Sequence, residues 1–364
     1  MQKALEVIDL ADFDRTDRDW PEKPAYLVVK SLDQSKRRKR MIEAKKRNRI
    51  GRIEPRPVAK GLLVKTLIQP GRPIDVEHAL QVCELREPRG LVEIDENYLL
   101  IAEIGKVFLL NRNSLAVEQT YQHPFFGFLH SLDFDPASGR FLVVSSGYDC
   151  LLEFDHASGE STWEWFFWEH GFHTLDGTLL VRDASMAKKI AAEGRKVRFI
   201  QPEVYGEQGI LTSERTNHPN SACYDPHNSD TIYVTLGHSG EILRINKRYN
   251  TFQTVFSDLG PMPHGIQPLK NGWAVTDTTR GAWLLLDKEF EKSKMVLFHH
   301  LPEKHPDAGD HEWIQNVLPY DDNQYLAIDA NRGLIMFNLQ KKKYCIIPVE
   351  SEWCIHHLTV NLRK

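Results

Sequence analysis

Paired cysteines are missing from this sequence. Its 364 residues include only five cysteines, and no two of them are spaced as C-x-x-C. An odd number of scattered thiols argues against a disulfide framework and is typical of a reducing compartment. We therefore expect free thiols and a cytoplasmic protein.

Long apolar runs are also missing. No stretch reaches the roughly 20 residues that a transmembrane helix needs, and residues 1–16 lack the basic-then-apolar order of a signal peptide. The chain after residue 88 also lacks the apolar period of long helices. The sequence therefore indicates neither a membrane span nor a helical repeat.

A strong excess of charge of one sign is absent too. The net charge is −4, which does not predict binding of nucleic acid or acidic substrates across the whole surface. Residues 36–52 differ, with ten Lys or Arg and one acid, Glu43; this block carries +9, so the remainder carries −13. We interpret the block as a basic helix within an N-terminal extension, residues 1–57. No aromatic residue interleaves with its charges, which disfavours nucleic-acid binding but leaves it open.

What the sequence does contain is a repeat of short strands. In one unit, His264–Leu269, Trp273–Asp277, Ala282–Asp287 and Lys294–His299 read as strands separated by turn residues. Four short strands in a unit of about 40 residues, several times over, are typical of a β-propeller. We predict an all-β propeller with four antiparallel strands per blade over residues 58–364.

Seven positions are predicted to start these units, at steps of about 40 to 50 residues. They are Arg89, His130, His170, Asn220, His264, Asn316 and His356. An aspartate follows three of them by thirteen residues, at Asp183, Asp277 and Asp329. This register predicts seven blades, or six if the third unit is only an insertion; residues 184–209 are expected to form a helical insertion. The last strand, 356–362, needs partners, which we place at 61–68 and 78–85 so that both termini close one blade.

Equivalent positions in a propeller line the central channel, so the four histidines of this register should converge. Imidazole is a common ligand of Zn and Fe. We predict a divalent metal, Zn or Fe, bound by His130, His170, His264 and His356. Asn220 and Asn316 would flank the metal, and Arg89 would orient an anionic group of a substrate. The alternative is that the histidines form only structural hydrogen bonds.

The run Pro263-His264-Gly265-Ile266, followed by a strand ending at Thr276-Asp277, resembles the NHL, SMP-30/gluconolactonase and streptogramin-lyase propellers. It is also similar to peptidyl-amidoglycolate lyases. That resemblance implies a zinc held by three channel histidines from separate blades, here three of the four above. A four-histidine ring is similar to carotenoid cleavage oxygenases, which bind non-haem iron, but their other motifs and greater length are absent.

These observations favour a metal-dependent enzyme that acts on a small organic molecule in the channel mouth, and Arg89 favours an anionic one. Lyase or hydrolase chemistry is favoured over an iron-dependent oxygenase. The alternative is a non-catalytic propeller that binds a protein or a ligand, because propellers are common scaffolds.

Overall fold

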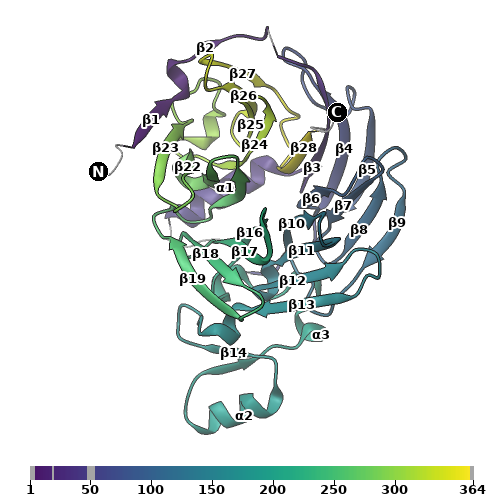
Figure 1. Cartoon of the computed structure of the whole chain (residues 1–364), viewed down its shortest axis with the longest axis vertical. Helices are drawn as coiled ribbons and strands as arrows, with labels where there is room; N and C mark the ends of the chain where they lie inside the picture. The colour runs from purple at the N-terminus through teal and green to yellow at the C-terminus, as the bar shows by residue number, and fades with distance from the viewer. Residues whose placement is uncertain (1–4, 19, 47–53, 361–364) are drawn as a thin grey trace.

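The computed structural model describes residues 5–18, 20–46 and 54–360 and forms a six-bladed β-propeller (Figure 1). Each blade is a four-stranded antiparallel sheet whose first strand lies nearest the central channel. Blade 1 contains β6 (Gly90–Glu93), β7 (Tyr98–Ala102), β8 (Val107–Asn111) and β9 (Val117–Tyr121). Blade 2 contains β10 (Leu129–Asp135), β11 (Arg140–Ser145), β12 (Cys150–Asp155) and β13 (Ser161–Phe166). Blade 3 contains β16 (Pro219–Asp225), β17 (Asn228–Leu236), β18 (Glu241–Asn246) and β19 (Thr251–Phe256).

The remaining three blades follow the same plan. Blade 4 contains β20 (His264–Leu269), β21 (Gly272–Asp277), β22 (Ala282–Leu286) and β23 (Lys292–Leu297). Blade 5 contains β24 (Ile314–Asp321), β25 (Gln324–Asp329), β26 (Gly333–Asn338) and β27 (Lys343–Ile347). Blade 6 has the order β28 (Ile355–Val360), β3 (Lys23–Val29), β4 (Lys60–Ile68) and β5 (Gln81–Arg86).

The middle strands are apolar on both faces because each blade packs between two others. All six residues of β26 are buried, and so are the first five of β12. Such strands read as continuous apolar runs instead of alternating ones. The propeller core therefore consists of apolar layers between neighbouring blades.

Both chain ends close the ring, as predicted, but with a different strand order. β28 pairs with β3, and β3 pairs with β4, so residues 23–29 lie between the two segments expected to be neighbours. The expected domain boundary at residue 57 therefore runs through blade 6. The N-terminal strands β1 (Glu6–Asp9) and β2 (Asp14–Arg15) add parallel outer strands to blades 4 and 5.

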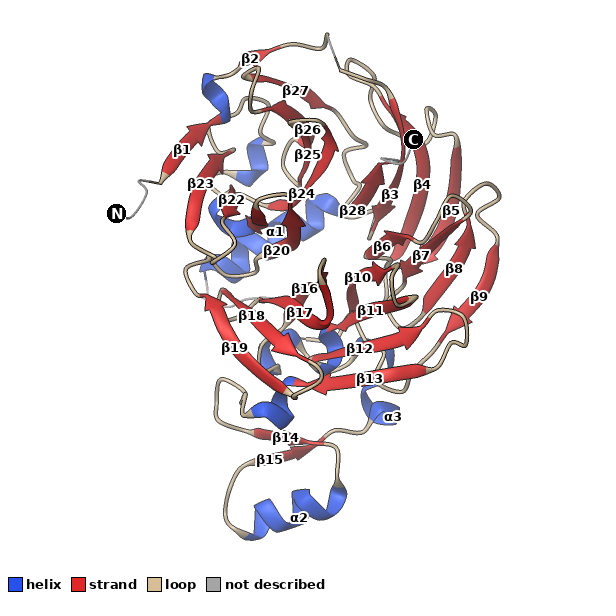
Figure 2. Cartoon of the chain, viewed as in Figure 1, coloured by secondary structure: helices blue, strands red, loops and turns tan. Residues whose placement is uncertain are grey.

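The prediction of seven blades is wrong, and the alternative of six is what the structure contains. Residues 167–218 form an insertion between blades 2 and 3, which projects from the ring in Figure 2. Its three-residue strands β14 (Leu179–Val181) and β15 (Val197–Phe199) pair in parallel on either side of α2 (Ala184–Ala192). The insertion also contains α3 (Pro202–Tyr205) and the 3-10 turns η3 (Phe167–His170), η4 (Gly206–Gln208) and η5 (Thr212–Glu214). Two such short strands cannot make a blade, although the helix expected near residue 184 is present.

Helix α1 (Gln34–Lys46) lies across the centre of the propeller (Figure 2). It corresponds to the first part of the basic helix predicted at 36–52; residues 47–53 lie outside the described residues. Two of its basic residues, Arg37 and Arg38, are buried. Among the described helices, none has the length and apolar composition to cross a membrane.

Candidate metal centre

The strands nearest the channel change register at the same level. β10, β16, β20, β24 and β28 each shift their pairing near their first residues, as β-bulges do, whereas β6 pairs regularly. A bulge re-aims side chains locally and often lies beside a functional site. The side chains at these shifts line one cavity: His130, Asn220, His264, Gln315 and His356. We call these five residues the ring.

Three of the predicted histidines meet in the ring. His130, His264 and His356 come from blades 2, 4 and 6, and one ring nitrogen of each lies within 4.8 Å of the others. Their ring centroids are 4.6 to 6.2 Å apart. Each side chain is at most 6% exposed. The convergence predicted for these three positions is therefore present.

His170 does not join them. Its ring stacks on Trp165, with the centroids 3.4 Å apart and the planes 3° from parallel, at the start of the insertion. The matching aspartate, Asp183, is the N-cap of α2, whereas Asp277 and Asp329 end the second strands of blades 4 and 5. The structure therefore brings three of the four predicted histidines together, because the third unit, which His170 starts, is an insertion and no blade.

Hydrogen bonds orient two of the imidazoles. The Nδ1 atom of His264 is 2.9 Å from the Thr278 hydroxyl, and Nδ1 of His356 donates to the Arg89 carbonyl at 3.2 Å. These contacts occupy Nδ1 of both rings, so Nε2 is the other nitrogen that each ring can offer to a ligand. The buried Nδ1 of His130 has no hydrogen-bond partner among the described residues. A metal ion at the cluster would therefore compete with Gln315 for Nε2 of His356, which lies 3.4 Å from the Gln315 amide nitrogen.

Burial keeps the three imidazoles neutral. It lowers the pKa of His264 to about 3, with a further contribution from Arg37, and it lowers the pKa of His130 and His356 well below the ordinary value. The mutual proximity of the histidines and the nearby charge of Lys30 act in the same direction. Neutral imidazole is the form that binds metal ions, so the cluster is ready for a ligand at neutral pH.

The two amides of the ring support the histidines. Asn220 Nδ2 donates to the Pro263 carbonyl at 3.0 Å, next to His264, and Asn220 Oδ1 is buried with no described partner. Gln315 accepts a bond from Trp313 Nε1 at 2.8 Å, and its Nε2 lies 3.4 Å from His356 Nε2. These contacts place one amide beside each of two histidines.

In the ring, Gln315 occupies the position on the inner strand of blade 5 that was predicted for Asn316. The register shift in β24 moves the ring position by one residue. Asn316 also lines the cavity, but its Oδ1 accepts a bond from the Val317 amide at 2.8 Å and lies against Gly265. Gly265 has φ +62, and a Cβ there would stand 2.0 Å from that oxygen, so this close approach requires glycine.

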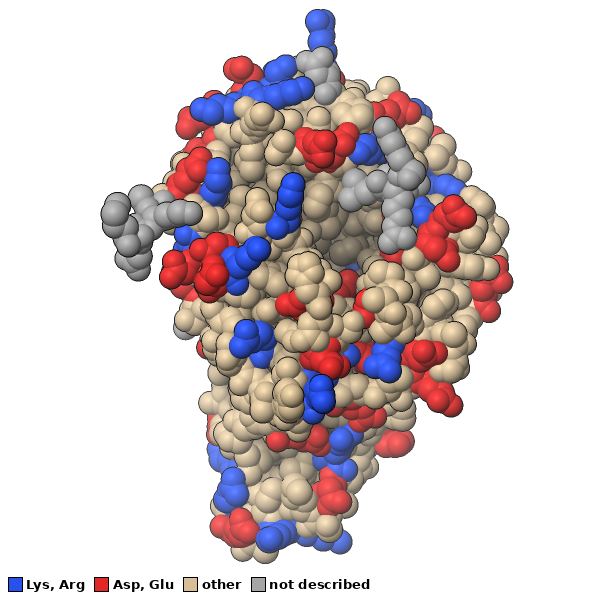
Figure 3. All heavy atoms as spheres, in the orientation of Figure 1, with Lys and Arg blue, Asp and Glu red and all other residues tan. Residues whose placement is uncertain are grey.

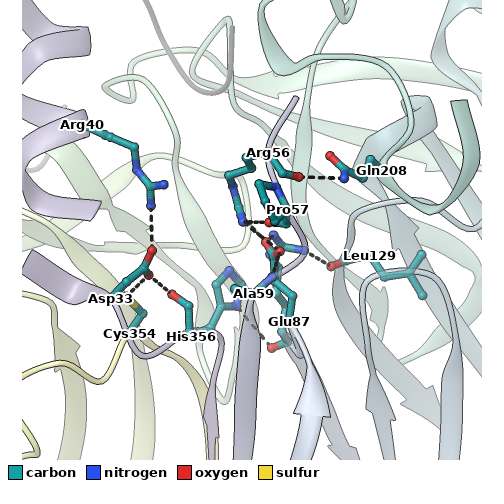
Figure 4. A network of polar contacts seen from close by, with 12 residues as sticks. Asp33, Arg40, Arg56, Pro57, Ala59, Glu87, Leu129, Gln208, Cys354 and His356 are labelled. Carbon is teal, nitrogen blue, oxygen red and sulfur yellow. Dashed lines mark hydrogen bonds and ion pairs between the residues drawn. The ribbon is translucent and has the colours of Figure 1, made fainter. Parts of the chain in front are cut away.

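Arg89 is near the ring, but its guanidinium does not line the cavity. The side chain is fully buried, pairs with Glu87 and stacks over Phe128 at 3.7 Å. Glu87 also binds Arg56 (Figure 4), and although burial opposes it, Arg89 and Arg56 lower the pKa of Glu87 to about 2. The predicted contact of Arg89 with a substrate is therefore not what this geometry favours; its carbonyl orients His356 instead.

The cavity below the ring has a volume of about 390 Å³. Figure 3 shows a hollow near the centre of this face, walled mostly by uncharged side chains. Further along the channel lie two carboxyl groups, Asp133 and Glu93. Burial raises the pKa of Asp133 to about 7, although its Oδ2 accepts a bond from the Tyr224 amide at 2.8 Å. Glu93 accepts a bond from the Thr359 hydroxyl, also at 2.8 Å.

The other end of the channel is covered by α1. From this helix, Arg37 lies 5.1 Å from the Trp313 ring and 3.4 Å from Gln315 Oε1. Gln34 donates to the Ala330 carbonyl at 2.6 Å. The ring therefore lies at the end of the channel that α1 covers. Polar side chains lie both at the ring and further along the channel, at Asp133 and Glu93.

The repeat pattern did not identify two further residues that act on the ring histidines. His218 lies 5.8 Å from the His130 ring, and its Nδ1 accepts a bond from Arg215 at 2.6 Å. Lys30 follows β3, and its charge contributes to lowering the pKa of all three histidines. Both residues lie outside the inner strands, so no repeat position could have identified them.

Comparison with known proteins reaches the fold and no further. No family model matches the sequence, and no curated protein matches it. A solved structure of a nidogen–laminin complex is similar with a TM-score of 0.53 at 9% identity, covering 94% of this chain and 99% of that chain. A protein of unknown function from Bacteroides caccae gives a TM-score of 0.53 at 11% identity, with 93% and 100% covered. These identities support the propeller fold alone.

Proposed function

We propose that this chain is a metal-dependent enzyme that binds one divalent ion at His130, His264 and His356. The observation that carries the proposal is the set of three buried, neutral imidazoles with ring nitrogens within 4.8 Å of one another. Three protein ligands that leave a coordination position open are typical of catalytic zinc sites. At a metal–nitrogen distance of about 2.0–2.1 Å, tetrahedral ligands stand about 3.4 Å apart, so a small contraction would complete the site.

The surroundings of the cluster favour hydrolase or lyase chemistry. An ion bound by neutral ligands would polarise a carbonyl group or activate a water molecule. Asp133 lines the same cavity, and its pKa of about 7 suits a group that accepts and donates a proton near neutral pH. The oxygenase alternative loses its main support, because His170 does not belong to the cluster.

The proposal is tested by elemental analysis of untagged protein reconstituted with Zn²⁺ or Fe²⁺ and then dialysed. We expect about one ion per chain in the wild type and in His170→Ala, and a loss of the ion in His264→Ala. Circular dichroism of each variant checks the fold. A His264→Ala protein that keeps its full metal content, or a wild type that retains none, contradicts the proposal and leaves a ligand-binding propeller as the alternative.

A further inference from the structure

We propose that the chain has a second binding site, in a cavity beside helix α1, for a small monocarboxylate with an apolar body. This cavity, which we call the α1 cavity, has a volume of about 330 Å³. It is lined by α1, by strands β25, β26 and β28, and by the loops next to them. Among the described residues, none lines both the α1 cavity and the cavity of the ring. The inference therefore goes beyond the proposed function and does not depend on a metal ion.

Arg38 is the cation that carries the inference. Its side chain lines the α1 cavity and is only 4% exposed. Its Nη2 atom donates to the Ala330 carbonyl at 3.4 Å, whereas Nε and Nη1 are buried without a hydrogen-bond partner in the part of the chain that the structure describes. These two atoms carry most of the N–H donors of the guanidinium, which stays charged. A buried cation with unmade hydrogen bonds is costly, so the cavity suits an anion.

The other cations that line the α1 cavity are already paired. Arg332 binds Asp329 at 2.7 Å, and Lys304 binds Glu312 at 2.6 Å. Arg38, by contrast, forms no ion pair with an acid of the described ranges 5–18, 20–46 and 54–360. One guanidinium without a carboxylate partner is suited to one negative charge, and a carboxylate matches the planar geometry of a guanidinium.

The remaining lining residues favour a carboxylate over a phosphate. Glu303 and Glu350 also line the α1 cavity and disfavour the second negative charge of a phosphate. Much of the rest is apolar and consists of Ile328, Pro348, Val349, Trp353 and Ile355. The volume lies in the range of small-molecule sites, about 300 to 1,000 Å³. The ligand therefore directs its carboxylate to Arg38 and packs an apolar body against these side chains.

Benzoate is a suitable probe because it joins a carboxylate to an apolar ring, and benzamide is its uncharged counterpart. We would titrate metal-free protein by isothermal calorimetry, so that no ion at the ring contributes. Arg38→Met removes the guanidinium. Arg40→Met is the matched control, since Arg40 lies on the same helix, is exposed and pairs with Asp33 (Figure 4).

Benzoate should bind the wild type and Arg40→Met at least about tenfold more tightly than benzamide or phosphate, the low end of what hydrogen bonds to a charged group contribute. In Arg38→Met, benzoate should bind at least about tenfold more weakly than in the wild type. Without benzoate, Arg38→Met should unfold at an equal or higher urea concentration than the wild type, because methionine replaces a buried cation that lacks partners.

Equal binding of benzoate and benzamide to the wild type, or no saturable binding of benzoate, would overturn the inference whether or not the variant folds. Phosphate that binds more tightly than benzoate would overturn the ligand class. Unchanged benzoate binding in Arg38→Met would overturn the role of Arg38. Each of these results leaves the metal content of the protein untouched, so the proposed function succeeds or fails separately.

Discussion

The inner strands of this propeller fall into two alternating sets. Blades 2, 4 and 6 bring histidines to the ring, whereas blades 3 and 5 bring the amides Asn220 and Gln315, and blade 1 brings the backbone of Arg89. Alternation separates the imidazoles around the channel, so that three of them can face one point. The neighbouring blades then supply the contacts that hold the histidines. Blades 2, 4 and 6 thus carry the histidines, and blades 1, 3 and 5 carry groups that contact them or their neighbours.

The largest expected effect is the loss of any one ligand. His130→Ala, His264→Ala and His356→Ala should each weaken Zn²⁺ binding at least about 100-fold, because two imidazoles leave the ion too few protein ligands. Competition with a chromophoric chelator measures the affinity. The three variants should behave alike; a histidine that can be removed with less than about a fivefold loss would break the threefold set.

A smaller effect is expected from the supporting blades. Asn220→Ala and Gln315→Ala should each weaken Zn²⁺ binding about 10-fold, the lower end of the effect of groups that orient metal ligands. Asn220→Ala should also lower the free energy of unfolding by about 1 to 3 kcal/mol, because the buried Pro263 carbonyl loses its donor. Chelator competition and urea denaturation give the two quantities.

Asn316→Ala is the matched control for Gln315→Ala, since the two residues are adjacent and both line the cavity. Only Gln315 contacts a histidine, so Asn316→Ala should change the Zn²⁺ affinity by less than about threefold. If the two variants lost the same affinity, the one-residue shift in β24 would not decide which amide supports the site.

The pH dependence of stability should report the buried histidines. The pKa of His264 is about 3 in the folded chain and about 6.5 when unfolded. The unfolded chain therefore binds a proton first as the pH falls, and stability is lost from about pH 6.5 downward. Metal-free wild type should lose about 1.2 kcal/mol more between pH 6 and pH 5 than His264→Gln.

Comparing wild type with His264→Gln separates the effect of His264 on stability from the effects of groups that stabilise the fold as the pH falls. The pKa of Asp133 is raised to about 7 in the folded chain, so its contribution to stability increases as the pH falls below 7. Asp133 is present in both proteins and its contribution cancels. Urea denaturation of both in EDTA at pH 7, 6 and 5 makes the measurement; parallel curves would mean that His264 is not neutral in the folded chain.

Features of this molecule that depend on local sequence could be predicted, whereas features that depend on contacts between distant residues could not. Local signals sufficed for the blades, because turn residues separate short apolar strands, as in His264–Leu297. They also sufficed for the three histidines that converge, which stand at the starts of inner strands. The partner of β28 was missed because β3 lies more than 300 residues away in the chain and carries no repeat signal.

The errors at the site have equally specific causes. A register shift moves the ring position from Asn316 to Gln315, and such a one-residue shift leaves no mark in the sequence. Lys30 was missed because it follows a second strand instead of starting a first one. His170-Gly171 has the same two residues as His264-Gly265. The segment that follows it, however, forms only two three-residue strands, which cannot complete a blade.

The smallest expected effects concern the third predicted unit, which the structure shows to be an insertion. His170→Ala removes a ring that stacks on Trp165, and Asp183→Ala removes the N-cap of the exposed helix α2. Each should lower the free energy of unfolding by about 1 kcal/mol or less. Neither should change the Zn²⁺ affinity beyond about twofold, because both residues lie outside the ring. A tenfold loss of affinity in His170→Ala would place this histidine at the metal after all and restore a four-ligand centre.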